Sequence, residues 1–285
     1  MINYLKNYIK FHIRFLLKIY RKILFKFDKN IFALLFNFRS LLIQSKARVS
    51  WKGSTFSVTE KGTNFKYKIR HQHQCNVAYE FGVKARADSL ADVYFLKQMK
   101  FKDGDIFLDC GANVGDLKIW FELQNKKIEY IGFEPSPIEF NCLKDNVYPS
   151  IVYNIGLWNK DGELTFYISS QGADSSLIEP KKYDKKIVSK VCKLEKFIDA
   201  PIKCLKLEAE GAEPEILEGL GDALGMIEYI SADLGYERGI DADSTLVPVT
   251  NFLITRGFEL VDEEHTRICA LYKNKHFKSL QPKKT

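Results

Sequence analysis

The stretch that most constrains the fold runs from residue 105 to residue 116 and reads Asp-Ile-Phe-Leu-Asp-Cys-Gly-Ala-Asn-Val-Gly-Asp. An apolar run ends at Asp109, glycines follow at Gly111 and Gly115, and apolar residues then recur at helical spacing over 117–123. This order predicts a buried strand, a tight turn and the start of a helix. That arrangement brings backbone close to a nucleotide-like ligand.

The spacing of the two glycines narrows the choice of ligand. A dinucleotide fold uses G-x-G-x-x-G, whose glycines let a pyrophosphate approach the helix N-terminus. Here only Gly111 and Gly115 are present, and Asp109 and Asp116 would repel a pyrophosphate. The turn therefore disfavours an NAD-dependent oxidoreductase and favours a cationic ligand without phosphate. S-adenosylmethionine, which carries a sulfonium, an ammonium and an adenosine, fits this description.

A second acid, Glu134, ends the next apolar strand, and an acid there can accept hydrogen bonds from both hydroxyls of a ribose. Pro135 would fix the turn that aims this carboxylate. Asn154, at the end of the third expected strand, would lie near the adenine. The residues expected around the methionine part of the cofactor are Asp109, Gly111, Asn113 and Gly115.

Three motifs together resemble the FkbM-type S-adenosylmethionine-dependent methyltransferases. They are Asp-Cys-Gly-Ala-Asn-Val-Gly at 109–115, Phe-Glu-Pro at 133–135 and Leu-Lys-Leu-Glu-Ala-Glu-Gly-Ala-Glu-Pro-Glu-Ile-Leu at 205–217. The resemblance covers residues 85–273 and implies an O-methyltransferase, a type often found in glycan or secondary-metabolite pathways. The chain departs from the family at Glu208, because members often carry Lys-x-Asp-Val-Glu-Gly with the shorter acid at that position.

Alternation of strands and helices after residue 86 predicts a Rossmann-like α/β fold with a mostly parallel sheet. The resemblance implies the class I methyltransferase variant, which closes the sheet with an antiparallel strand pair, here expected at 258–262 and 268–273. The other expected strands lie near 105–109, 129–133, 150–155, 203–208 and 227–233, and the expected helices near 115–124, 137–146, 212–219 and 243–256. The predicted domains are a basic helical arm (1–50), a small β-rich lead-in (51–85), the methyltransferase domain (86–275) and a flexible basic tail (276–285).

Carboxylates crowd the end of the fourth expected strand. Glu208 and Glu210 are two residues apart, so in an extended chain they share a face, and crowded carboxylates raise one another's pKa. Such a group can act as general base for a hydroxyl acceptor. We expect Glu210 to be that base, with Glu208 second, and Asp233 and Arg238 to contact the substrate. No metal ligands are assigned, because His71-Gln-His73-Gln-Cys75 has no matching second half at zinc spacing.

The charge is unevenly distributed. The chain carries a net +7, and residues 1–52 contain twelve Lys and Arg and a single acid, so they contribute +11 and the remainder carries −4. A nucleic-acid partner is therefore not indicated for the catalytic part.

In residues 1–30 cationic side chains alternate with aromatic and aliphatic ones at helical spacing, which favours binding to an anionic membrane surface. A helix that packs on the catalytic domain or on a second subunit is the alternative. The basic residues that recur every four positions are Lys6, Lys10, Arg14, Lys18, Lys22 and Lys26.

The compartment is predicted from cysteine usage and from the arm. Six cysteines without C-x-x-C spacing are typical of reduced thiols in the cytosol. Charges interrupt every turn of the arm, so neither a transmembrane span nor a signal-peptide core is expected. We therefore expect a cytoplasmic protein bound to the inner face of a membrane. Its expected reaction is the methylation of a sugar hydroxyl of a glycan or glycan precursor. The alternative function is a non-catalytic membrane adaptor that retains the fold. The sequence does not predict the number of subunits.

Overall fold

The computed structural model describes residue 20, residues 23–169 and residues 174–277. The chain divides into two compact units, Met1–Arg86 and Ala87–Thr285. Residues 1–19 and 21–22 of the predicted basic arm and residues 278–285 of the predicted C-terminal tail lie outside the described residues. Within the described part, no helix combines the length and the apolarity that a bilayer crossing requires.

In the first unit, a helix packs on a small antiparallel sheet. Asp28 caps the helix, because its carboxylate accepts hydrogen bonds from the backbone N–H groups of the first turn. Phe32 on the inner face of the helix meets the ring of Phe56 in the sheet at 5.4 Å. The side-chain amide of Asn37 pairs with the backbone of Val49 in both directions. The elements are α2 (Lys29–Leu42), β1 (Ala47–Lys52), β2 (Thr55–Glu60), β3 (Lys66–Ile69) and the short helices η1 (Leu24–Lys26) and α3 (Gln72–Ala78).

The predicted boundary between arm and lead-in, after residue 50, falls inside β1, in a unit where α2 belongs to the arm and β2 and β3 to the lead-in. The His71-Gln-His73-Gln-Cys75 segment forms the N-cap and the first residues of α3. A helix α4 (Val83–Val93) follows.

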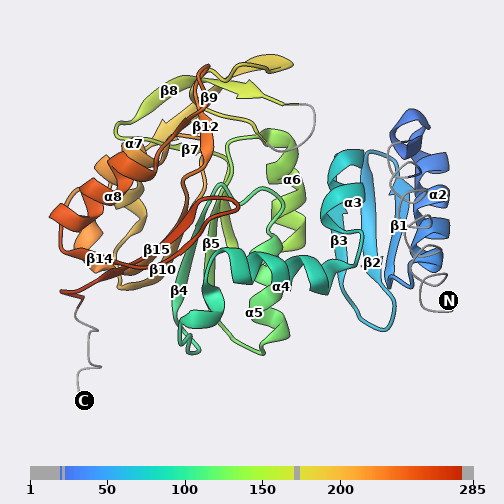
Figure 1. Cartoon of the computed structure of the whole chain (residues 1–285), viewed down its shortest axis with the longest axis horizontal. Helices are drawn as coiled ribbons and strands as arrows, with labels where there is room; N and C mark the ends of the chain where they lie inside the picture. The colour runs from blue at the N-terminus through green and yellow to red at the C-terminus, as the bar shows by residue number, and fades with distance from the viewer. Residues whose placement is uncertain (1–19, 21–22, 170–173, 278–285) are drawn as a thin grey trace, which may run out of the picture. The chain divides into compact units, whose positions relative to one another are not determined.

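The second unit is built on a seven-stranded sheet in the order β14-β15-β11-β10-β4-β5-β6 (Figure 1). Strands β11, β10, β4, β5 and β6 run parallel, whereas β15 runs antiparallel to both of its neighbours, β11 and β14. The expected antiparallel closing pair and the expected fold class are thus confirmed. The strands are β4 (Ile106–Cys110), β5 (Glu129–Phe133), β6 (Ile151–Tyr153), β10 (Ile202–Leu207), β11 (Ile227–Asp233), β14 (Phe258–Glu264) and β15 (Cys269–Asn274).

Helices cover both faces of this sheet, as parallel strands buried on two sides require. Helices α4, α5 and α6 lie on one face and α7 and α8 on the other (Figure 1). Four short 3₁₀ segments complete the helical elements of the described residues, three of them in this unit. The bounds are α5 (Asp116–Leu123), α6 (Pro137–Asn146), α7 (Glu213–Glu218), α8 (Leu246–Thr255), η2 (Leu96–Gln98), η3 (Leu194–Phe197) and η4 (Gly221–Met226).

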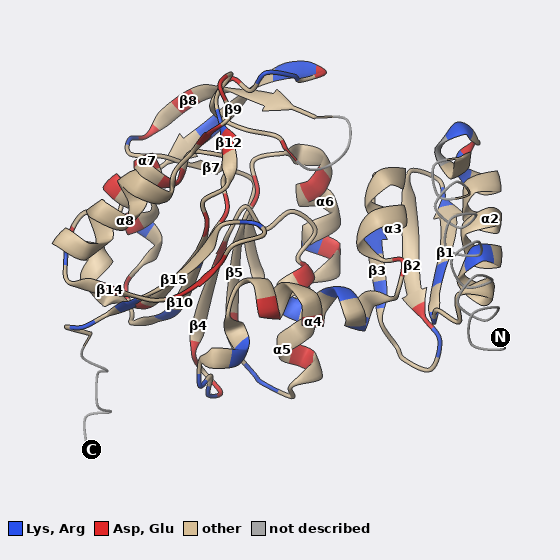
Figure 2. Ribbon diagram, viewed as in Figure 1, with Lys and Arg blue, Asp and Glu red and all other residues tan. Residues whose placement is uncertain are grey.

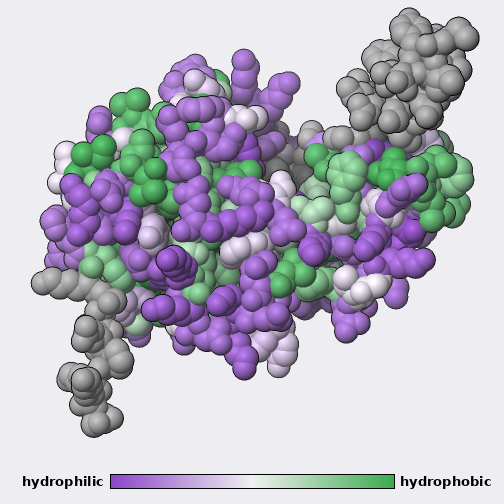
Figure 3. All heavy atoms as spheres, turned by 60° about the horizontal axis from the view of Figure 1, so that its bottom comes forward, coloured by the Kyte–Doolittle hydropathy of each residue, from purple (hydrophilic) through white to green (hydrophobic). Residues whose placement is uncertain are grey.

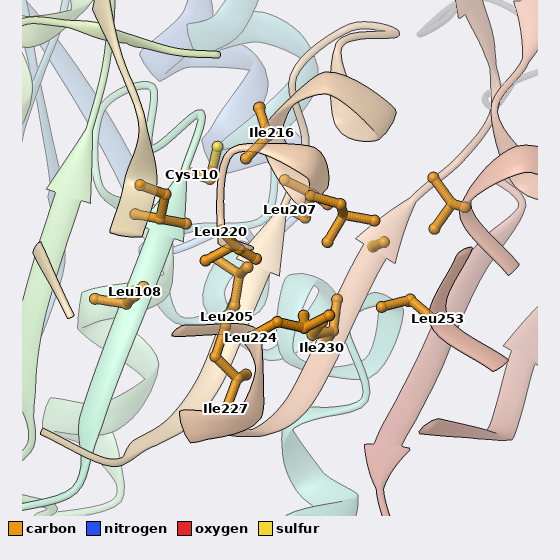
Figure 4. Close-up of a cluster of buried hydrophobic side chains, with 14 of the residues drawn as sticks. Leu108, Cys110, Leu205, Leu207, Ile216, Leu220, Leu224, Ile227, Ile230 and Leu253 are labelled. Atoms are coloured by element: carbon orange, nitrogen blue, oxygen red, sulfur yellow. The ribbon is translucent and has the colours of Figure 1, made fainter. Parts of the chain in front are cut away.

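Alternate residues of each central strand enter two different cores. Leu108 of β4 and Leu205 of β10 join an aliphatic cluster with side chains of α7, η4 and α8 (Figure 4). Phe107, on the other face of β4, packs edge-on against Phe121 of α5 with ring centroids 5.0 Å apart. Burial of this kind is worth roughly 1.5–3 kcal/mol for each large apolar side chain. The two cores fix the position of the strand ends that carry the polar residues of the candidate site.

A smaller sheet follows the third parallel strand, where the sequence pattern breaks. Its order is β7-β9-β8, and β8 and β9 pair with each other in antiparallel orientation. Two further short strands, β12 and β13, pair with each other and were not expected. The bounds are β7 (Gly156–Leu157), β8 (Gly162–Ile168), β9 (Lys185–Cys192), β12 (Tyr236–Arg238) and β13 (Asp243–Ser244).

Candidate active site

The expected site residues gather at one edge of the sheet, because the carboxyl ends of parallel strands meet there. The strand order reverses between β4 and β10, and ligands of open α/β sheets bind at this kind of switch point. Asp109 lies at the carboxyl end of β4 and Gly111 follows that strand, Glu134 follows β5, and Glu208 follows β10. Residues far apart in the sequence are thereby brought to one crevice.

The turn after β4 requires glycine at its first position. Gly111 has φ +72°, and a Cβ placed there would lie 1.8 Å from the carbonyl oxygen of Glu208. The backbone N–H of Gly111 donates to the carbonyl oxygen of Phe133 at 3.0 Å, which fastens the turn to β5. Asn113 has a positive φ of 48°, and Gly115, with φ +89°, precedes the first residue of α5. The turn is therefore a fixed structure with backbone on its surface.

Glu134 is buried and already holds backbone groups on both of its oxygens. One oxygen accepts the N–H of Asn113 at 2.9 Å and the other the N–H of Ser136 at 2.8 Å. Burial, with the nearby Glu139 carboxylate, raises the pKa of Glu134 to about 8 against the opposing effect of these N–H donors. Each oxygen keeps a second lone pair. Two donating hydroxyls would therefore find acceptors here and would favour the ionised form.

Asn154 fixes the turn that carries Glu134. Its side-chain amide donates to the carbonyl oxygens of Glu134 at 2.8 Å and Pro135 at 3.1 Å. The structure thus brings Asn154, Glu134 and Pro135 together, with Asn154 bound to the backbone of the other two.

Asp109 is buried at the end of β4, and each of its oxygens has a neighbour in the chain. It accepts a hydrogen bond from the hydroxyl of Tyr130 at 2.6 Å and forms an ion pair with Lys206 at 3.1 Å. Burial raises the pKa of Asp109, against the lowering effect of Lys206 and Tyr130. Its carboxylate therefore supports the turn from beneath.

Glu208 lies between two cations. One of its oxygens is 2.9 Å from Lys206 Nζ and the other is 2.9 Å from a guanidinium nitrogen of Arg267. Burial alone would raise the pKa of Glu208, but the two cations outweigh it and lower the pKa to about 2. Arg267 also pairs with the buried Asp233 at 2.6 Å. A carboxylate this acidic is a weak proton acceptor at neutral pH.

Glu210 has the opposite surroundings. Its side chain is in hydrogen-bonding contact with that of Glu237, a residue of β12. Burial and repulsion from Glu237, with smaller contributions from Glu208 and Asp174, raise the pKa of Glu210 well above its usual value. Two carboxylates in contact share a proton, so the pair retains one near neutral pH.

Among the described residues, Arg238 binds a carboxylate and a backbone carbonyl of the chain itself. Its guanidinium forms two hydrogen bonds to the carboxylate of Glu215, at 2.6 Å and 2.8 Å, and a third to the carbonyl oxygen of Gly211. A Cβ at Gly211 would lie 2.5 Å from the Cα of Arg238. Arg238 thus holds the loop that follows Glu210.

A cavity opens beside the turn and contains about 340 Å³ of empty space, which includes its open mouth. The cavity reaches the cofactor turn at Gly111, the second strand end at Pro135 and the loop after β10 at Ala209. Its walls are largely apolar, and its lining residues are Cys110, Gly111, Phe133, Pro135, Ile155, Gly156, Leu157, Phe166, Leu177, Ala209 and Ile216. No group of His, Cys, Asp and Glu suited to a metal ion occurs among the described residues.

Three residues of this edge were missed by sequence reasoning: Lys206, Arg267 and Glu237. A lysine between two leucines in a buried strand was a usable signal, because a buried charge requires a partner. Arg267 and Glu237 gave no local signal, since their partners lie 59 and 27 positions away.

We expect Glu208→Gln to lower the free energy of unfolding by roughly 2–3 kcal/mol at pH 7, because Lys206 and Arg267 lose their shared partner. Since folding lowers the pKa of Glu208 from 4.5 to about 2, its stabilising effect is complete above pH 4.5 and is lost as the pH falls towards 2. Urea unfolding at pH values from 8 down to 2 measures both effects. Glu259→Gln, at an exposed position of β14, is the control. Equal losses for the two variants would contradict the assignment.

Comparison with known proteins agrees with this geometry. The sequence model of the Methyltransferase FkbM domain matches residues 109–232, which include the turn after β4, Glu134 and the loop after β10. A protein of Beauveria bassiana (strain ARSEF 2860) named Methyltransferase 1 is 24% identical, over 57% of this chain and 76% of its own length.

Solved structures give weaker similarities. A SAM-dependent methyltransferase from Aquifex aeolicus is 14% identical, covers 67% of this chain and 97% of its own, and has a TM-score of 0.39. A precorrin-6y C5,15-methyltransferase from Geobacter metallireducens is also 14% identical, with coverages of 66% and 89% and a TM-score of 0.39. Similarity at this level is no basis for assigning an acceptor. Residues 109–232 are similar to the Methyltransferase FkbM domain, and together with the related methyltransferase this match identifies the chain as an S-adenosylmethionine-dependent methyltransferase.

Proposed function

We propose that this methyltransferase acts on oxygen, at a hydroxyl of a sugar in a glycan or glycan precursor. The observation that supports the proposal is the contact between the carboxyl groups of Glu210 and Glu237. Glu210 follows Ala209, which lines the cavity. A hydroxyl must lose its proton as it attacks, so a group that exchanges a proton near neutral pH suits an O-methyltransferase.

The cofactor fits the crevice on three counts. Glu134 offers two free lone pairs for ribose hydroxyls, Gly111 exposes backbone, and the cavity beside Pro135 has apolar walls for a flat ring. When bound, S-adenosylmethionine supplies a methyl group on a positively charged sulfur. The part of the chain around this turn is rich in carboxylates, which favour a cation.

The acceptor proton goes to the carboxylate pair. As the acceptor oxygen bonds to the methyl carbon, the carbon–sulfur bond breaks and the hydroxyl proton passes to Glu210, with Glu237 sharing it. The cofactor leaves as neutral S-adenosylhomocysteine, and the pair returns its proton to solvent. Alignment of the acceptor supplies much of the acceleration. Glu208, held ionised by Lys206 and Arg267, has a structural role in this scheme.

A sugar acceptor agrees with one further feature of the same strand. Tyr236 precedes Glu237 on β12, and 70% of its surface is exposed. An exposed tyrosine offers a flat apolar face with a hydroxyl at its end, which suits a ring that bears both C–H and O–H groups. The class of acceptor also follows from the FkbM resemblance.

A membrane surface is the proposed setting. Residues 1–52 carry eleven excess positive charges, and Figure 2 marks basic residues on η1, α2 and β1. The outer side of α2 exposes Leu34, Phe38 and Leu41, each by more than half of its surface. Figure 3 shows hydrophobic side chains gathered at the surface of this unit. Apolar and basic side chains together bind anionic lipid surfaces.

The acceptor is tested by a methyl-transfer screen over nucleotide-linked and lipid-linked sugars, with S-adenosylhomocysteine release as the readout. We expect turnover with at least one sugar class. Glu134→Ala should weaken binding of S-adenosylhomocysteine by roughly 10- to 100-fold in calorimetry, because two hydrogen bonds to a carboxylate are lost. Cofactor binding without turnover on any sugar would favour the adaptor alternative, and unchanged affinity in Glu134→Ala would contradict the assigned site.

The carboxylate pair predicts the pH dependence of the reaction. Since the pKa of the pair is raised, kcat/KM should increase with pH as the shared proton is lost. Glu237→Gln removes the repulsion that raises the pKa of Glu210, so the rise should move to lower pH. Glu210→Gln should reduce kcat by 10²–10⁴-fold and leave cofactor affinity within about twofold. An unchanged profile in Glu237→Gln would exclude a shared proton, and an equal loss of kcat and of cofactor affinity in Glu210→Gln would indicate a structural role.

Flotation with vesicles tests the membrane setting. We expect the full chain to float with anionic vesicles and to remain behind with neutral ones, because the basic residues need anionic lipid. The double substitution Leu34→Glu/Phe38→Glu on α2 should reduce flotation, whereas Val188→Glu, at an equally exposed position of β9, should not. Equal flotation of the two variants would show that α2 does not contact lipid.

A further inference from the structure

Lys206 is the most completely engaged charged residue of the described chain. It lies on β10 between Leu205 and Leu207, and only 3% of its side chain is exposed. Its ammonium nitrogen has four oxygen neighbours, and an ammonium has three protons to share among them. The neighbours are the carbonyl oxygens of Cys110 at 3.1 Å and Gly111 at 2.8 Å and the carboxylates of Asp109 at 3.1 Å and Glu208 at 2.9 Å.

These neighbours belong to the two loops that border the cavity. Cys110 and Gly111 form the start of the cofactor turn and line the cavity, whereas Glu208 begins the loop that leads to Glu210. The two loops touch directly, since the N–H of Glu208 donates to the carbonyl oxygen of Cys110 at 3.2 Å. Lys206 lies beneath this contact and binds both sides of it.

The ammonium also keeps its charge. Burial lowers the pKa of Lys206, but Asp109 and Glu208 outweigh burial and raise it above the ordinary value for lysine. Lys206 is therefore a permanent donor and cannot serve as the base. A charged donor binds a carbonyl oxygen more strongly than a neutral one does.

We infer that Lys206 is a positioning residue that sets the orientation of the Cys110 and Gly111 peptide groups, and thereby the shape of the turn that receives the cofactor. With both carbonyl oxygens drawn towards β10, the opposite side of the turn faces the cavity. The inference rests on the proposed placement of S-adenosylmethionine at this turn. It assigns Lys206 to cofactor affinity rather than to proton transfer.

Lys206→Met tests the inference, because methionine fills a similar volume without a donor. The matched control is Lys203→Met on the same strand, which removes an ion pair to Glu228 at 3.0 Å that is also mostly buried. Circular dichroism and thermal unfolding establish that both variants are folded at the assay temperature. Calorimetric titration with S-adenosylhomocysteine then measures affinity.

We expect Lys206→Met to weaken S-adenosylhomocysteine binding by roughly 10- to 100-fold, and Lys203→Met to stay within about twofold of the parent protein. Folded Lys206→Met with unchanged affinity would overturn the inference, and so would equal losses in the two variants. If the parent protein itself does not bind S-adenosylhomocysteine, the proposed cofactor site fails instead, so the two failures are distinguishable.

Lys206→Met can also fail to fold, because it leaves Asp109 and Glu208 as buried carboxylates with one cation fewer. The double variant Asp109→Asn/Lys206→Met removes one buried charge of each sign, and Asp109→Asn is its reference. Adding Lys206→Met to that reference should weaken binding by a further factor of roughly ten, because the contacts of Lys206 to the two carbonyl oxygens of the turn and to Glu208 are then lost. Equal affinity of the double variant and its reference would refute the positioning role.

Discussion

The structure of the site depends on a chain of alternating charges at the carboxyl edge of the sheet. It runs from Asp109 through Lys206, Glu208 and Arg267 to Asp233, with each neighbouring pair between 2.6 Å and 3.1 Å apart. An isolated buried charge would cost several kcal/mol, so each member is tolerable only because its neighbours are present. The chain connects the ends of β4, β10 and β11 with the segment between β14 and β15. These segments can therefore be held in one relative arrangement while the turns above them stay free to bind a ligand.

The two loops at this edge of the sheet meet so closely that glycine is required at position 111. The contact between the two loops at the switch point is so close that a side chain at Gly111 would collide with the carbonyl oxygen of Glu208. Lys206 can reach the carbonyl oxygens of Cys110 and Gly111 only because the loops meet at this distance. Gly111 and Lys206 therefore both depend on the close approach of these two loops. This accounts for backbone, rather than side chains, forming the cavity wall at that point.

The order of elements could be predicted from the sequence, because each has a local signature. Buried strands appear as apolar runs and helices as apolar residues at helical spacing, and the strand at 129–133 and the helix at 137–146 have the predicted bounds. Partnerships between distant residues have no such signature. Glu208 and Glu210 looked alike as acids on one face of a strand. The nearby Lys206 and the distant Arg267 flank the first, whereas Glu237 of β12 contacts the second. The positions of the acids were predictable, but their protonation depends on contacts that only the fold creates.

Three acids near one crevice thus acquire three different roles from their surroundings. Glu134 is buried and holds backbone N–H groups, which directs its remaining lone pairs to a donor ligand. Two cations pair with Glu208 and keep it ionised, so Glu208 stabilises the structure of the site. Glu210 has a carboxylate as its neighbour and retains a shared proton. Because their environments separate the pKa values of these similar groups, one acid can bind a ligand, another can stabilise the structure and a third can exchange protons. Because the separation arises from Lys206, Arg267 and Glu237, the residues that determine the chemistry of this edge include ones that need not touch the substrate.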